Sequence, residues 1–70
     1  MSLREYARTN PDRPVELKPS LMRPCFNIGT TDGRLLEFHS TRTDAVRVLE
    51  ANGYSRTRGC LWTRAGNPNL

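Results

Sequence analysis

The sequence predicts an α+β fold: a small antiparallel sheet, made of a β-hairpin and one or two later strands, with one helix packed on one face. Three observations predict it. Two apolar runs surround Asp32-Gly33, an apolar stripe at helical spacing follows Thr41, and two short strand-like runs flank Gly59. Because 70 residues form one domain at most and bury only about 60% of the unfolded surface, we expect oligomerisation or docking on a larger partner to add stability.

Residues 1–24 are predicted to form an extended or flexible, proline-rich arm. Four of the five prolines lie there, and each removes a backbone donor and restricts the residue before it. Leu3 to Arg8 could form a single helical turn. The arm could remain flexible, or it could dock on the body or on a neighbouring chain through its few apolar residues, which are Val15, Leu17, Leu21 and Met22.

Residues 25–66 are predicted to form the folded body, of the type ββαβ(β), and it begins with a hairpin. A two-residue loop, Asp32-Gly33, would pair Ile28 with Glu37 and mix apolar with polar side chains on each face. A three-residue loop, Thr31 to Gly33, pairs Ile28 with Leu36 and is preferred. This register places four apolar side chains on one face: Phe26, Ile28, Leu36 and Phe38.

The segment after Ser40 carries the strongest local signal, which is that of a helix of about three turns. Thr41 is a candidate cap, and Asp44 three residues later nearly completes a capping box. Asn52-Gly53 is a helix stop, and Tyr54 is placed to contact Leu49. The apolar stripe that should pack on the hairpin comprises Ala45, Val46 and Leu49.

The chain offers little to catalysis or metal binding. Two cysteines and one histidine cannot complete a zinc site without carboxylates, and no phosphate-cradling glycine motif is present. Glu37 and His39 form the one pair suited to acid–base work, but an ordinary polar sheet face is the favoured explanation for them. We therefore predict a protein that is not an enzyme and that binds no cofactor and no metal. Without a signal peptide or membrane span, we expect a cytoplasmic protein in which free Cys25 and Cys60 are favoured over a disulfide.

The C-terminal third is basic. The net charge is +4, ten of the eleven basic residues are arginine, and no acidic residue follows Glu50. Arginine beside an exposed aromatic suits nucleic acid, because guanidinium pairs with phosphate and bases stack on rings. The candidate binding residues for nucleic acid or a partner are Arg56, Arg58, Arg64, Trp62, Arg47 and Arg42.

Two simpler interpretations of these residues stay open. Trp62 could belong to the core, and the arginines could protect an exposed edge strand from pairing with other chains. The arginine content could also reflect a genome rich in G and C. After Gly66, residues 67–70 are predicted to be a tail.

The stretch from Val48 to Pro68 resembles part of the HicA-type toxins, in which a helix ends in an asparagine-glycine-aromatic step and a β-hairpin follows. Here that step is Asn52 to Tyr54. The family has a small double-stranded-RNA-binding-like fold and cleaves messenger RNA, so the resemblance implies contact with RNA or DNA. The family's hairpin carries a catalytic histidine after a glycine-serine step. In this chain Cys60 follows Gly59, so the resemblance does not imply cleavage.

Two functions from different classes remain. The first is a small basic, non-catalytic module that contacts nucleic acid or a ribonucleoprotein through Arg56, Arg58 and Arg64, with Trp62 available for stacking. The second is a phage- or plasmid-type accessory protein that binds and inhibits a host protein complex. It is similar to anti-restriction and anti-CRISPR proteins in size and composition alone. A homodimer formed through the arm or a sheet edge is a third possibility, and no membrane contact is expected.

Overall fold

The structure, a computed structural model, describes residues 1–64 and confirms a small α+β fold with an antiparallel sheet. It has five strands and two helices, where the sequence analysis expected fewer strands and one helix. The elements in chain order are α1 (Leu3–Thr9), β1 (Val15–Pro19), β2 (Phe26–Thr30), β3 (Leu35–His39), α2 (Arg42–Ala51), β4 (Tyr54–Arg58) and β5 (Leu61–Arg64). The predicted end of the body at residues 65 and 66 and the predicted tail lie outside the described residues.

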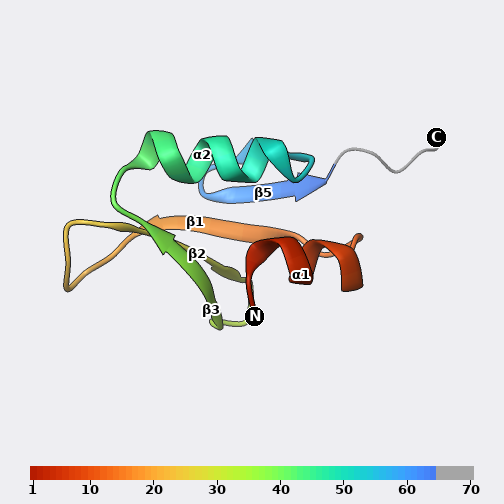
Figure 1. Cartoon of the computed structure of the whole chain (residues 1–70), viewed down its shortest axis with the longest axis horizontal. Helices are drawn as coiled ribbons and strands as arrows, with labels where there is room; N and C mark the ends of the chain where they lie inside the picture. Colours follow the sequence, from red (N-terminus) through yellow and green to blue (C-terminus); the bar gives the residue numbers. More distant parts are fainter. Residues whose placement is uncertain (65–70) are drawn as a thin grey trace.

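The strands are arranged in the order β3-β2-β1-β5-β4, and every neighbouring pair is antiparallel. β1 is therefore the central strand, with the β2–β3 hairpin on one side and the β4–β5 hairpin on the other (Figure 1). Strand β1 was not expected from the sequence. The sheet consequently joins two hairpins that are far apart in the chain.

The segment predicted to be an arm, residues 1–24, is instead part of the fold. Helix α1 has a complete capping box, in which Ser2 accepts from the Glu5 backbone N–H and the Glu5 carboxylate accepts from the Ser2 N–H. The apolar side chains of α1, at positions i, i+3 and i+4, are buried. Val15 and Leu17 of β1 are also buried, at 0% and 6% exposure. Of the prolines that argued for an arm, Pro14 directly precedes β1 and Pro19 is its last residue, so both lie at strand ends, where a missing N–H is tolerated.

The β2–β3 hairpin has the predicted three-residue loop but not the predicted strand register. Thr30 N–H donates to the Arg34 carbonyl, and Gly33 occupies the left-handed region with φ of 100°. Beyond the loop, however, Ile28 pairs with Glu37, because Leu36 is an extra residue in a β-bulge between the pairs Ile28–Glu37 and Gly29–Leu35. The expected pairing of Ile28 with Leu36 is therefore wrong.

The bulge redistributes the side chains of β3. Leu36 and Glu37 both lie on the helix side of the sheet, where Leu36 is only 8% exposed. Leu35 and Phe38 lie on the opposite side and are 53% and 55% exposed. The prediction that Phe38 belongs to the core face is therefore wrong.

Helix α2 is formed as its local signals predict. The Thr41 side chain accepts from the Asp44 N–H, and Ala45 and Leu49 are fully buried. The helix stops at Asn52, and Gly53 follows with φ of 89°. Within residues 1–64, neither helix has the length and apolar character needed to cross a membrane.

Both helices cover the same side of the sheet, and a single core lies between them and the strands. The other side, which we call the open face, has no covering element among the described residues. Its side chains come from alternate positions of each strand, including Glu16, Lys18, Asn27 and Leu35. The sheet thus has one covered and one open side, and each carries a distinct surface.

Leu3 tests whether the N-terminal segment is part of the core. Its side chain is fully buried, so Leu3→Ala should lower the free energy of unfolding by about 3 kcal/mol, whereas Leu3→Met should cost less than about 1.5 kcal/mol. Leu21→Ala, at a side chain 98% exposed, is the matched control and should change it by less than about 0.5 kcal/mol. Urea unfolding measures all three. If Leu3→Ala were as stable as the wild type, α1 would not be packed on the core, and the N-terminal segment would be an arm as first predicted.

Candidate nucleic-acid interface

Trp62 lies in the core rather than on the surface. It is 4% exposed and belongs to the core, where it pairs with Val15 of β1 across the sheet. The interpretation of this residue as core, which the sequence left open, is the one the structure supports. Base stacking on this ring would require the core to open.

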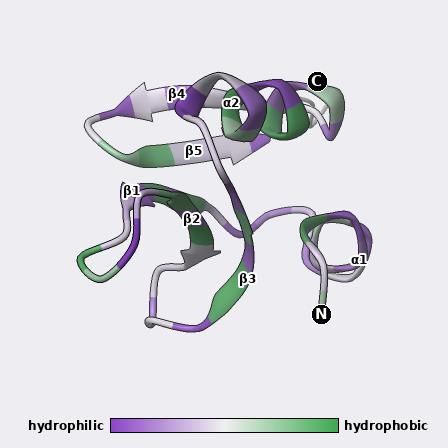
Figure 2. Cartoon of the chain, turned by 60° about the vertical axis from the view of Figure 1, so that its left-hand side comes forward, coloured by the Kyte–Doolittle hydropathy of each residue, from purple (hydrophilic) through white to green (hydrophobic). Residues whose placement is uncertain are grey.

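Arg56 and Arg58 lie on β4, an edge strand, and both are exposed. A register shift separates them: Arg56 pairs with Trp62, and Arg58 pairs with Leu61. Because paired residues share a face, Arg56 lies on the helix side and Arg58 on the open side. Arg56 also donates from Nε to the Gly59 carbonyl at 3.0 Å. The two arginines therefore do not form one patch, although β4 shows no hydrophobic colour in Figure 2.

Arg42 and Arg47 lie on α2 and are exposed. Arg47 is 3.9 Å from the Asp44 carboxylate one turn earlier, an exposed pair of the kind that contributes little to stability. No hydrogen bond or ion pair within residues 1–64 connects either arginine with Arg56, Arg58 or Arg64. The six residues predicted as one site are thus distributed over the core, the edge strand β4, the strand β5 and helix α2.

Arg64 occupies a different setting, at the junction of β5 with the C-terminal ends of both helices. Its guanidinium donates from Nη1 to the Ala7 carbonyl of α1 at 3.0 Å. It also lies against Gly53, where any added Cβ would be 3.4 Å from Nε. Arg64 therefore holds α1 to the sheet through a contact between residues 57 positions apart.

Arg4 and Arg8 of α1 share a hollow with Arg64. This hollow, which we call the arginine hollow, has a volume of about 580 Å³. Its lining comes from α1, from the end of α2 and from β5: Arg4, Ala7, Arg8, Ala51, Asn52, Gly53 and Arg64. Arg4 and Arg8 were not predicted as site residues, because both lie in the segment expected to be an arm. Their spacing of four residues, which sets both on one face of a helix, was the available signal.

The charges of the arginine hollow are not balanced by its lining, because none of the residues that line it is acidic. Arg4 and Arg8 make no ion pair or side-chain hydrogen bond within the described chain. Like charges four residues apart on a helix repel each other, at a cost of about 0.2 to 0.5 kcal/mol. The helix C-termini offset part of this charge, and Arg64 donates a hydrogen bond to the Ala7 carbonyl near the end of α1. An anion seated among the three guanidiniums would relieve the remaining repulsion.

Tyr54 lies next to the arginine hollow, and its pKa depends on burial and on the charge of Arg64. Its ring is 2% exposed, and its hydroxyl has no hydrogen-bond partner within residues 1–64. Burial raises the pKa of the Tyr54 hydroxyl above its ordinary value of 10.0, and the positive charge of Arg64 partly offsets that rise. The neutral phenol is therefore the form that the folded protein favours.

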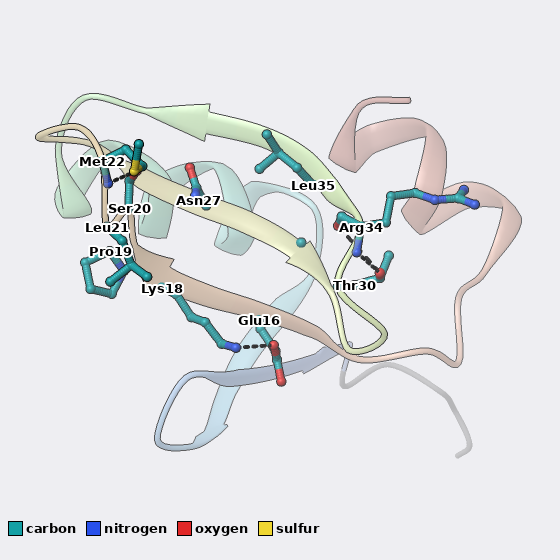
Figure 3. A pocket seen from close by; sticks show the side chains of 12 residues that line it. Glu16, Lys18, Pro19, Ser20, Leu21, Met22, Asn27, Thr30, Arg34 and Leu35 are labelled. Atoms are coloured by element: carbon teal, nitrogen blue, oxygen red, sulfur yellow. Dashed lines mark hydrogen bonds and ion pairs between the residues drawn. The ribbon is translucent and has the colours of Figure 1, made fainter.

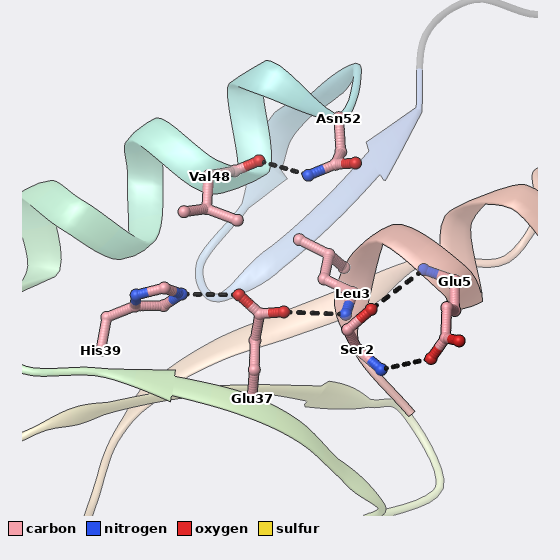
Figure 4. A network of polar contacts seen from close by, with 7 residues as sticks. All are labelled: Ser2, Leu3, Glu5, Glu37, His39, Val48 and Asn52. Carbon is pink, nitrogen blue, oxygen red and sulfur yellow. Dashed lines mark hydrogen bonds and ion pairs between the residues drawn. The ribbon is translucent and has the colours of Figure 1, made fainter.

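Glu37 and His39, the one pair suited to acid–base work, are engaged with each other and with α1 (Figure 4). Glu37 Oε2 is 2.6 Å from His39 Nε2, and Glu37 Oε1 accepts from the Leu3 N–H at 2.8 Å. The Leu3 N–H is one of the donors that the first turn of α1 leaves unpaired. The bulge at Leu36, which turns Glu37 toward the helices, makes this contact possible.

The two cysteines, Cys25 and Cys60, are free thiols in the structure. Among residues 1–64, no three side chains of histidine, cysteine, aspartate or glutamate come close enough together to hold a metal ion. No protein-family model, curated protein or solved structure matches this chain.

Tyr54→Phe should remove a buried, unpaired hydroxyl, so at about pH 7 its free energy of unfolding should equal or exceed that of the wild type. In the wild type the folded-state pKa lies above the unfolded value. The raised pKa of Tyr54 therefore contributes to the free energy of unfolding below pH 10, and this contribution is lost as the pH rises through the folded-state pKa. Urea unfolding between about pH 7 and pH 11 should show a shallower alkaline decline for the variant. Parallel declines would contradict this role.

Glu37→Ala should lower the free energy of unfolding by about 1 to 2 kcal/mol, because the Leu3 N–H then loses its acceptor. Glu37→Gln keeps an amide oxygen for Leu3 and should lose less. Glu50→Ala, at an exposed position of α2, is the control. Urea unfolding monitored by Trp62 fluorescence measures the three variants. A Glu37→Ala protein as stable as the control would show that the carboxylate does not hold α1.

Proposed function

We propose that this protein is a small non-catalytic module that binds the phosphate backbone of a nucleic acid in the arginine hollow. The observation that carries the proposal is the convergence of Arg4, Arg8 and Arg64 on one hollow whose lining includes no carboxylate. Guanidinium binds phosphate through paired hydrogen bonds, and it does so better than lysine. In this proposal α1 and β5 provide the phosphate contacts, rather than the edge strand β4.

The aromatic residues beside the hollow support backbone contacts rather than base contacts. Tyr6, Tyr54 and Trp62 are 8%, 2% and 4% exposed, so none presents a ring to an incoming base. Sequence is read by groups that reach base edges or stack on bases, whereas phosphate contacts set position without reading sequence. The proposed binding is therefore independent of base sequence and depends strongly on salt.

The test is fluorescence anisotropy with labelled duplex and single-stranded probes of both RNA and DNA at low protein concentration. Three phosphate contacts predict a slope of log K against log salt of about −2 to −3 between about 50 and 200 mM salt. Arg4→Gln/Arg8→Gln leaves one contact, so the slope should fall to about −1 and the affinity should decrease at least about tenfold.

The matched control is Arg23→Gln/Arg34→Gln, which also removes two positive charges but lies outside the arginine hollow. Glutamine is uncharged and has nearly the helix propensity of arginine, so Arg4→Gln/Arg8→Gln should unfold at the wild-type urea concentration. Arg23 and Arg34 lie outside both helices and are exposed, so the control should unfold there as well. The control should keep the wild-type slope. Equal losses in the two double variants, or no binding of any probe at low salt, would overturn the proposal.

A further inference from the structure

The open face carries a second surface, independent of the arginine hollow and different in chemistry. Four large apolar side chains gather there around a groove of about 380 Å³ and its extension along β3. We call it the apolar groove, after Leu21, Met22, Leu35 and Phe38, which are 98%, 90%, 53% and 55% exposed. A single exposed apolar residue is ordinary, but a contiguous group marks an interaction site.

The groove is built by specific features of the chain. The bulge at Leu36 brings Phe38 to the open face, where Leu35 also lies. The loop that carries Leu21 and Met22 is held by Ser20, whose Oγ accepts from the Met22 and Arg23 N–H groups at 3.3 Å each. Figure 3 shows Leu21 and Met22 on this loop at one end of the groove and Arg34 at the other. The apolar side chains are therefore presented by ordered backbone.

Gly29 gives the groove a floor of bare backbone. It lies on the open face between Glu16 and Leu35, and an added Cβ would be 2.7 Å from the Arg34 carbonyl oxygen. A side chain at this position would both clash with the bulged strand and fill the groove. The bulge thus excludes a side chain from the middle of the surface.

The charged residues beside the groove indicate which kind of partner it can bind. Lys18 is neutralised by Glu16 at 3.0 Å. Arg34 lines the end of the groove and extends toward a second hollow beside α1, and Arg23 lines the extension of the groove. Neither arginine has an ion-pair partner within residues 1–64. A second copy docked face to face would bring two such pairs of arginines together, so the surface disfavours self-association. Carboxylates flanking an apolar segment would complement it.

We propose that the apolar groove binds a segment of a partner protein that presents large apolar side chains flanked by aspartate or glutamate. The apolar side chains would cover Leu21, Met22, Leu35 and Phe38, and the carboxylates would pair with Arg23 and Arg34. Three of the four groove side chains are aliphatic, which favours a protein segment over the stacked bases of a nucleic acid. Because the groove and the arginine hollow lie on opposite sides of the sheet, this proposal stands whether or not the hollow binds nucleic acid.

The test is selection from a displayed library of random peptides against the immobilised full chain. Enriched peptides should combine two or more large apolar residues with flanking Asp or Glu. Their affinity should fall at least tenfold for Leu35→Thr/Phe38→Thr and for Arg23→Gln/Arg34→Gln, and the second loss should shrink at high salt. Arg4→Gln/Arg8→Gln, which removes the same charge elsewhere, should bind these peptides as the wild type does.

Three outcomes would overturn the proposal: enriched peptides that are basic, peptides that bind all variants equally, and a library that yields no binder. Sedimentation and a labelled single-stranded RNA probe test the other occupants. Self-association or RNA binding that is lost in Leu35→Thr/Phe38→Thr would assign the groove to a second copy or to RNA instead. Threonine suits exposed strand positions, so the urea unfolding midpoint of this variant should match the wild type and separate lost binding from lost folding.

Discussion

β1 forms hydrogen-bonded ladders along both of its edges, and the rest of the structure depends on this double pairing. On one side Val15 to Pro19 pair with Thr30 to Phe26, and on the other Val15 and Glu16 pair with Trp62 and Leu61. Without β1, the two hairpins would have no common sheet and the helices would have no continuous surface to cover. Isolated two-stranded hairpins are at best marginally stable in water.

Local signals in the sequence predicted the elements whose partners are close in the chain. The Thr41 cap, the Asn52-Gly53 stop and the three-residue hairpin loop each depend on a few adjacent residues, and each is present. β1 was missed because it offers only Val15 and Leu17 as a strand pattern, with prolines next to it. The bulge at Leu36 could not be predicted, because it depends on the packing of Leu36 and Glu37 against helices that the hairpin sequence does not contain.

The candidate site also depends on contacts between residues that are far apart in the chain. The C-terminal third was identified as basic from its composition, but a register shift between Arg56 and Arg58 sets these two arginines on opposite faces, and Trp62 is buried in the core. The arginine hollow combines Arg64 with Arg4 and Arg8, and only the contact of α1 with β5 brings them together. Neither the sequence of α1 nor that of β5 contains a pattern that predicts this contact. Spacing along α1 could predict the shared face of Arg4 and Arg8, but not what that face adjoins.

The central position of β1 also governs the order in which the fold can be completed. β1 precedes its first partner, β2, by a short loop, but it meets its second partner, β5, only after more than forty further residues have been made. Until then the β1–β3 sheet has an unpaired edge that carries the apolar Val15. Docking of the β4–β5 hairpin closes that edge by placing Trp62 opposite Val15. This long-range step, rather than helix formation, should set the folding rate and the interval in which the chain is open to aggregation.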